Sequence, residues 1–392
     1  MCACLELRWS NFFFDADPPP THTLLCFFVV LLERAEIDCL PDALVVSSAV
    51  SADNVEVRSA LKYNIPVYKR GAWLGRITKG YDTVSVAGTH GKTSTSAMLA
   101  LVLEKQYDSV TAIVGGDVSQ FEGNEGGSLI GTSNWFVLEA DEYDHAFLDL
   151  QSKYAIVTNV ELDHLDIYES EEELFSAFDE FMDRVHAEGA LVMCGDDEGC
   201  RSLIERAETR LADSTSRASI YTYGFGEEND WRASDIEEDG ELTSFEVQWK
   251  GMPVGRVQIS LFGKHNVLNA LAVISLASVI QFKEVRSLNT EMEKREMTFT
   301  EKLKESLQHS KSILREFQGV DRRCQIIGER SGCVVISDYA HHPTEVSATL
   351  EAIESRYSDS EILVVFEVGF SSPFRWAPVE TNTLYFLASY SL

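Results

Sequence analysis

Basic residues are scarce in this 392-residue sequence, which has 33 lysines and arginines against 63 aspartates and glutamates. The formal net charge of −30 repels phosphate backbones and anionic lipids, which argues against nucleic acid or a membrane surface as a partner. The same charge repels anionic small molecules. Any phosphate site must therefore gather its positive potential locally, from a lysine, a helix N-terminus and a metal ion.

Paired cysteines and long hydrophobic runs are also lacking. None of the eight cysteines forms a CxxC pair with histidines at zinc spacing, which favours reduced thiols and a cytoplasmic protein. The apolar run at residues 24–32 is shorter than the roughly 20 residues that span a bilayer, and prolines and aspartates precede it in place of a signal peptide's basic residues. We predict a buried strand there. A plastid location is the alternative if the first residues are not those of the natural protein.

From residue 43 onwards, apolar runs alternate with helix-like segments. Strands are predicted at residues 83–88, 135–140, 154–160 and 190–195, and helices at 92–105 and 170–185. This alternation predicts an α/β fold with a parallel sheet covered on both faces. Residues 221–260 have the apolar–polar alternation of antiparallel strands, an apolar helix is predicted at 263–277, and 282–312 is expected to be an insertion or a solvated helix. A second α/β unit begins near residue 319, and its rhythm is lost after residue 366.

The run GTHGKT at residues 88–93 lies between a predicted strand and a predicted helix, as a phosphate-binding loop requires. Its glycines let the backbone approach phosphate, and the amides of the turn and the helix N-terminus face the anion. Lys92 is expected to reach the β- and γ-phosphates of ATP, and the Thr93 hydroxyl to hold Mg²⁺. Val86 stands where the longer loop has its first glycine, so this is the shorter G-x-x-G-K-T form. The alternative is a chance glycine-rich turn.

Acidic residues follow two of the predicted strands. The run EADEYD begins at Glu139, and the run NVELDHLD supplies Glu161, Asp163 and His164. The carboxyl ends of parallel strands face the ligand crevice, and oxygen ligands with an imidazole there suit Mg²⁺ bound mainly through phosphates and water. Each run alone is more typical of a surface loop, but together with the phosphate loop they favour a metal site.

Two further polar groups accompany the phosphate loop. The helix predicted at 263–277 opens with His265, Asn266 and Asn269, which either cap the helix or face a ligand. Downstream, arginines, an aspartate and a doubled histidine stand beside a strand–helix junction, where they serve a transferring phosphoryl group or bind a ribose. These residues are Arg322, Arg323, Asp338, His341 and His342.

In their order along the chain, GTHGKT, EADEYD, TNVELDHLD, GKHNVLNAL, GVDRR and DYAHHPTE resemble the motifs of the Mur ligases. The likeness covers residues 43–366, and EADE and DYAHHPTE are most similar to members that add L-alanine to UDP-N-acetylmuramate. The resemblance implies an ATP- and Mg²⁺-dependent ligase of peptidoglycan precursor synthesis. In such a ligase, ATP phosphorylates the muramoyl carboxylate, and the amine of alanine attacks the acyl phosphate.

The resemblance also implies three domains: a partial UDP-sugar domain at residues 1–80, a central ATP-binding domain at 81–318 and a truncated C-terminal domain at 319–392. It assigns Lys92, Arg323, His341 and His342 to the reacting centre. It assigns Mg²⁺ to Thr93, Glu139 and His164. The implied nucleotide-binding residues are Gly88, Thr89, His90, Gly91, Lys92, Thr93, Ser94, His265, Asn266, Asn269 and Asp338.

The sequence departs from the family pattern at both ends. Residues 1–40 lack the glycine-rich nucleotide turn of the first domain, and only about two dozen residues follow residue 366. We therefore expect partial terminal domains, with an inactive derivative of the ligase as one outcome. A ligase that recycles muramoyl-peptides and a nucleotide-binding protein without ligase activity also fit the sequence.

Overall fold

The computed structural model describes residues 41–48, 50–121, 126–163, 167–210, 217–239, 242–287, 299–366 and 384–388. The strand predicted at 24–32 and the predicted metal ligand His164 lie outside these residues. The first described elements form a small α/β unit in which β1 and β2 pair in parallel. Its elements are β1 (Leu44–Val46), α1 (Val55–Lys62), β2 (Val67–Lys69) and α2 (Arg70–Ile77).

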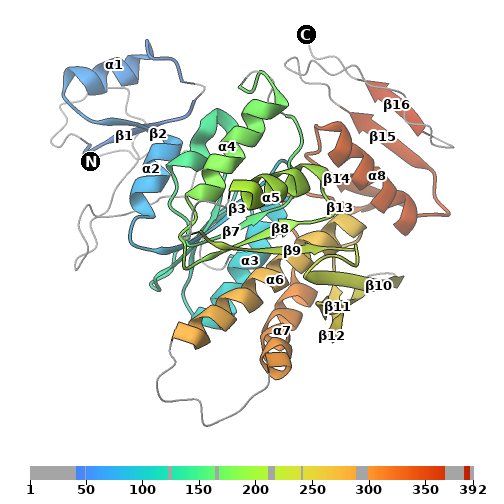
Figure 1. The fold of residues 1–392 in the computed structure, drawn as a ribbon. Coiled ribbons are helices and arrows are strands. Elements are labelled where there is room, and N and C mark those ends of the chain that lie inside the picture. The colour runs from blue at the N-terminus through green and yellow to red at the C-terminus, as the bar shows by residue number, and fades with distance from the viewer. Residues whose placement is uncertain are drawn as a thin grey trace.

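A ten-stranded sheet forms the centre of the described structure, as Figure 1 shows. Its strand order is β12-β11-β10-β9-β8-β7-β3-β6-β4-β5. All pairs from β10 to β4 are parallel, which confirms the predicted α/β fold with a parallel sheet. The strands are β3 (Asp82–Ala87), β4 (Thr111–Ile113), β5 (Ser128–Leu129), β6 (Trp135–Glu139), β7 (Tyr154–Val157), β8 (Ala190–Cys194), β9 (Ser219–Gly224), β10 (Trp231–Asp239), β11 (Leu242–Trp249) and β12 (Met252–Ile259).

The prediction of antiparallel strands for the whole of 221–260 is wrong at its beginning. Strand β9 pairs in parallel with β8, and only β10, β11 and β12 pair antiparallel. The polar residues of β9 gave it the alternation of an antiparallel strand, because a strand near the end of a parallel sheet has one face less covered than the central strands. In β3, by contrast, all residues from Thr83 to Ala87 are buried.

Helices cover the sheet on both faces, with α3, α6 and α7 on one side and α4 and α5 on the other (Figure 1). The carboxyl end of β3 leads through a short loop directly into α3, which packs on the first of these faces. The helices are α3 (Lys92–Tyr107), the 3₁₀ helix η1 (Tyr143–Asp149), α4 (Glu171–Asp183), α5 (Glu198–Arg210), α6 (Lys264–Ser287) and α7 (Phe299–Glu316).

The expectation of a solvated segment after residue 282 is wrong for α7. This helix buries Leu303, Leu307 and Leu314 in the core, and Ser306 meets Ser278 of α6 through their hydroxyl groups. The charged residues lie on its other faces, which is the pattern of an amphipathic helix. Helix α6 is long and apolar enough to cross a membrane, but 78% of its apolar window is buried in the protein, as in a core helix.

The second α/β unit lies beyond α7. The antiparallel strands β13 (Gln325–Arg330) and β14 (Cys333–Ser337) are followed by α8 (Pro343–Arg356) and β15 (Ile362–Phe366). A strand also occurs in the final segment, where the sequence predicted no regular element: β16 (Leu384–Ala388) pairs in parallel with β15. His342 caps α8, and Pro343 occupies its first turn, where a missing amide hydrogen costs nothing.

Candidate active site

The phosphate loop joins β3 to α3, as the sequence predicts. Gly88 and Gly91 both have positive φ, at 126° and 80°. A Cβ on Gly88 would lie 2.2 Å from Thr158 Oγ1 and 2.8 Å from the backbone oxygen of Asn159, so only glycine fits there. Gly91 is the N-cap residue of α3, which places the positive end of the helix at the loop.

Two residues after β7 hold the loop in place, and sequence reasoning did not single them out. The His90 amide donates to Asn159 Oδ1 at 2.7 Å, and the Thr89 amide donates to the Asn159 carbonyl at 3.0 Å. The Thr158 hydroxyl donates to the His90 carbonyl at 2.6 Å. Their signals in the sequence are their position at the end of a predicted parallel strand and their place at the start of the TNVELDHLD run.

Lys92 lies within the loop, held by acceptors of the protein itself. Its Nζ donates to the carbonyls of Gly88 and Thr89 at 2.6 and 3.1 Å and to Glu142 at 3.0 Å. Burial by itself lowers the pKa of Lys92, but the carboxylates of Glu142, Glu139 and Asp141 outweigh it and raise the pKa. The ammonium group is therefore charged while it lies at the loop. Sequence reasoning missed Glu142, although it belongs to the EADEYD run.

Thr93 and Glu139 lie side by side, as predicted for Mg²⁺ ligands. The Thr93 hydroxyl donates to Glu139 Oε1 at 3.1 Å, and the Gly115 amide donates to Glu139 Oε2 at 2.6 Å. Arg323, from the segment after α7, donates from Nη2 to Thr93 Oγ1 at 3.4 Å. The hydroxyl in the first turn of α3 and the carboxylate at the end of β6 are hard oxygen donors, so these residues fit Mg²⁺ shared with a nucleotide phosphate. His164, the third predicted ligand, is not among the described residues.

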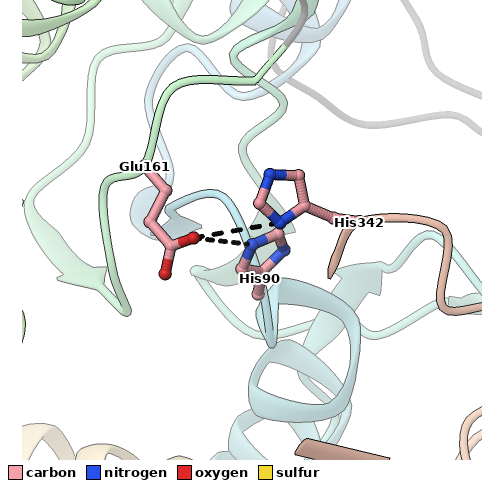
Figure 2. A group of neighbouring side chains, drawn as sticks. All are labelled: His90, Glu161 and His342. Carbon is pink, nitrogen blue, oxygen red and sulfur yellow. Dashed lines mark ion pairs between the residues drawn. The ribbon is translucent and has the colours of Figure 1, made fainter. Parts of the chain in front are cut away.

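A cluster of two histidines and a glutamate joins the phosphate loop to the second α/β unit (Figure 2). We call His90, Glu161 and His342 the His–Glu–His cluster. His90 Nε2 lies 3.6 Å and His342 Nδ1 3.8 Å from Glu161 Oε2, and the two imidazole rings lie 4.6 Å apart. Glu345 of α8 approaches His90 Nδ1 from the other side, at 3.2 Å. The sequence offered Glu161 as an oxygen ligand for Mg²⁺, whereas Glu345 had no assigned role in the predicted site.

The charges in and around this cluster shift its pKa values. Burial lowers the pKa of His90, but Glu161 and Glu345 more than compensate and raise it to about 9. Burial raises the pKa of Glu345, but His90, the His341 amide and Arg323 bring it down to about 2. His90 and Glu345 therefore form an ion pair at neutral pH, between the loop and α8.

The doubled histidine is divided between two environments. His342 is buried and packs against His90 with the two rings tilted by 38°, whereas the side chain of His341 is 59% exposed and lies 3.6 Å from Glu345. Only His342 thus contacts the phosphate loop. Both oxygens of Asp338 accept backbone amides, those of Cys324 and Ala340, at 2.6 Å, which ties β14 to the turn before β13.

The predicted nucleotide-binding residues on α6 also differ in how close they lie to the phosphate loop. Asn269 comes close to the loop, because a Cβ on Gly91 would meet its Oδ1 at 2.7 Å. Asn266 donates to the Phe262 carbonyl at 2.9 Å and lies next to His265. Burial lowers the pKa of His265 to about 4, so this imidazole is neutral. Ser94 is half-buried in the first turn of α3.

Comparison with known proteins decides the family. The Mur ligase middle domain matches residues 86–277, and the Mur ligase glutamate ligase domain matches residues 322–373. The chain belongs to the Mur ligase family. The first match contains the phosphate loop and Glu139, and the second contains Arg323, His342 and Glu345, so both halves of the described site lie within family domains.

Curated Mur ligases resemble the chain over most of its length. It is 38% identical to the UDP-N-acetylmuramate–L-alanine ligase of Carboxydothermus hydrogenoformans over 327 residues, which are 83% of this chain and 62% of that protein. It is 36% identical to the ligase of the same name from Frankia casuarinae over 346 residues, which are 83% of this chain and 64% of that protein. The chain thus spans less than two thirds of the length of these relatives.

Solved structures agree with this family. The UDP-N-acetylmuramate–alanine ligase of Thermotoga maritima superposes with a TM-score of 0.65 at 27% identity, covering 84% of this chain and 67% of that one. A murein peptide ligase from Psychrobacter arcticus has a TM-score of 0.60 at 22% identity, covering 86% and 68%. The second comparison supports the shared fold alone.

Proposed function

We propose that this chain carries the catalytic core of an ATP-dependent ligase that joins L-alanine to the carboxylate of UDP-N-acetylmuramate. The observation that carries the proposal is the meeting of Lys92, Thr93 and Glu139 from the central domain with Arg323 from the second α/β unit. A nucleotide bound at the loop would be enclosed by both units. The named activity of the relatives supplies the amino acid and the sugar nucleotide.

The chemistry that this site supports is phosphoryl transfer followed by acyl transfer. Lys92 would exchange the carboxylate of Glu142 for the β- and γ-phosphates of ATP. Thr93 and Glu139 would hold Mg²⁺, which would neutralise phosphate charge. Arg323 is placed to stabilise the charge of the transferring phosphoryl group. The sugar carboxylate takes the γ-phosphoryl group and ADP leaves. The alanine amine then attacks the acyl carbon, loses a proton and displaces inorganic phosphate.

The experiment follows ADP and phosphate release by purified protein given MgATP, UDP-N-acetylmuramate and L-alanine. The proposal expects release that requires all three substrates and is lost in Lys92→Ala. ATP binding without alanine-dependent ADP release would contradict it and favour a nucleotide-binding protein without ligase activity. A parallel reaction replaces alanine with the tripeptide L-alanyl-γ-D-glutamyl-meso-diaminopimelate, because a structural relative from Neisseria is named for that substrate. Preference for the tripeptide would favour the recycling ligase instead.

A further inference from the structure

The His–Glu–His cluster has the composition of a transition-metal site. One ligand atom from each of His90, Glu161 and His342 lies within 4.8 Å of the other two. The three residues come from separate elements: the phosphate loop, the segment after β7 and the N-cap of α8. Figure 2 shows the two imidazoles and the carboxylate gathered around a common point.

The distances within the cluster suit a metal better than hydrogen bonds. Glu161 Oε2 lies 3.6 Å from His90 Nε2 and 3.8 Å from His342 Nδ1, both beyond hydrogen-bond range. In a tetrahedral site with zinc–ligand bonds of about 2.0–2.2 Å, neighbouring ligand atoms lie about 3.4 Å apart. The two distances to Glu161 Oε2 therefore need to contract by only a few tenths of an ångström.

His90 provides the independent sign of a ligand. Its Nε2 is buried and has no hydrogen-bond partner in the described structure. A buried polar atom without such a bond is costly, and a bound ion is one of the ordinary explanations for it. The nitrogen faces Glu161, the carboxylate of the cluster (Figure 2).

We propose that His90, Glu161 and His342 bind a divalent transition-metal ion of the Zn²⁺ class, with water in the fourth position. Two imidazoles and one carboxylate match the ligand preferences of Zn²⁺ and not those of Mg²⁺, which prefers oxygen ligands. The site is therefore separate in chemistry from the Thr93–Glu139 pair. The inference does not depend on the proposed ligase activity.

Residues of α8 complete the surroundings of the site. Glu345 Oε1 lies 3.2 Å from His90 Nδ1, so the Nδ1 hydrogen points to this carboxylate, and Nε2 binds the metal once the ion displaces its proton. The Thr344 hydroxyl donates to Glu161 Oε2 at 2.7 Å and orients that carboxylate. His342 Nδ1 accepts a long bond, 3.4 Å, from the Thr344 amide, which a metal bond would replace.

A metal at this site would tie α8 to the phosphate loop. Its ligands join the loop of the central domain to the N-cap of a helix in the second unit, and within the described residues the cysteines are free, so no disulfide makes that connection. Binding should therefore raise the thermal unfolding temperature, because the ion binds only the folded arrangement.

The test uses Co²⁺ as a spectroscopic substitute for Zn²⁺, added to protein freed of metal with a chelator. The pH is about 8, where the ion must displace one proton from His90, whose pKa is about 9. Wild type should show visible absorption typical of tetrahedral Co²⁺, saturating at one ion per chain, and Zn²⁺ should abolish it. His342→Ala and Glu161→Gln should each weaken binding by more than about 100-fold, and Glu345→Gln by about 10–100-fold, as for a residue that orients a ligand.

The matched control is His341→Ala, which removes the neighbouring, exposed imidazole and should bind Co²⁺ like wild type. Circular dichroism of each metal-free variant checks its folding, and Glu161→Gln keeps the shape of the side chain if His342→Ala is unstable. The proposal would be overturned if wild type bound no Co²⁺ or if all variants bound it equally. Thiolate charge-transfer bands in the absorption spectrum would also overturn it, because they would place the ion on cysteines. None of these measurements requires ATP turnover, so failure here and failure of the ligase proposal are distinguishable.

Discussion

The buried ion pair between Lys92 and Glu142 gives the sharpest test of how the site is stabilised without a nucleotide. The Glu142 side chain is only 2% exposed, and Lys92 Nζ is 3.0 Å away. Lys92→Met keeps the length of the apolar stem but leaves the carboxylate buried without its lysine. Removing one partner of a buried pair costs about 3–5 kcal/mol of unfolding free energy, because the remaining charge stays desolvated.

Glu142→Gln should partly rescue this loss. In the double variant Lys92→Met/Glu142→Gln, the buried group is a neutral amide, so we expect the two changes to cost less together than the sum of the single changes. The coupling should be at the upper end of the range of about 0.5–3 kcal/mol found for residues in contact. The matched control is Lys153→Met, which breaks a 2.7 Å pair with Asp82 whose side chains are 34% and 32% exposed. Its expected cost is about 0–1 kcal/mol.

The assay is urea unfolding followed by circular dichroism, repeated across pH. Burial raises the pKa of Glu142, and removing Lys92 raises it further. A carboxyl group whose pKa is higher in the folded state binds its proton more tightly there, so the stability of Lys92→Met should fall as pH rises and recover as pH falls. The reasoning fails if Lys92→Met costs no more than Lys153→Met, or if its loss is the same at acidic and neutral pH.

Three further predictions concern the loop and its ion pair. Gly88→Ala should abolish ATP binding and lower the free energy of unfolding by more than about 2 kcal/mol. Gly80→Ala also has positive φ but open space around its Cβ, so it should lower the free energy of unfolding by only about 1 kcal/mol; calorimetric ATP titration and urea unfolding measure the two effects. The raised pKa of His90 should contribute up to about 3 kcal/mol of stability that is complete below pH 6.5 and lost as pH rises through about 9, and Glu345→Gln should reduce this dependence in pH-resolved unfolding curves. Thr93→Ala should lose the Mg²⁺ dependence of ATP binding in the same titration and Thr93→Ser retain it, and equal behaviour of the two would refute the assigned role of the hydroxyl.

The part of the site that could be predicted depends on local rules. Gly88, Lys92 and Thr93 follow one another between a strand and a helix, so their relation to a bound phosphate is set within a few residues. Glu139 joins them because β6 is parallel to β3 and in register, Val86 being opposite Glu139. The alternation of strands and helices along the chain is enough to imply that arrangement.

The remainder depends on contacts between distant segments. Glu345 meets His90 only because α8 docks on the phosphate loop, 255 residues further along the chain. Which of His341 and His342 turns inward is decided by the cap geometry at the start of α8, and the sequence HHP is compatible with either choice. The buried face of α7 was hidden by its many charged residues, because an amphipathic helix needs only a narrow apolar stripe.

In this acidic chain, the cations around the phosphate loop are paired with carboxylates of the protein. A net charge of −30 disfavours the binding of phosphate. Three cations near one loop, Lys92, Arg323 and His90, offset this repulsion locally. Each of these cations faces a carboxylate of the protein, Glu142 for Lys92 and Glu345 for His90 and Arg323. The phosphates of ATP must therefore replace carboxylates of the protein, and the affinity for nucleotide is the difference between two sets of ion pairs. Glu142→Gln should for this reason bind ATP more tightly than wild type, even though it makes the fold less stable, and weaker binding would mean that Glu142 positions Lys92 rather than competing for it.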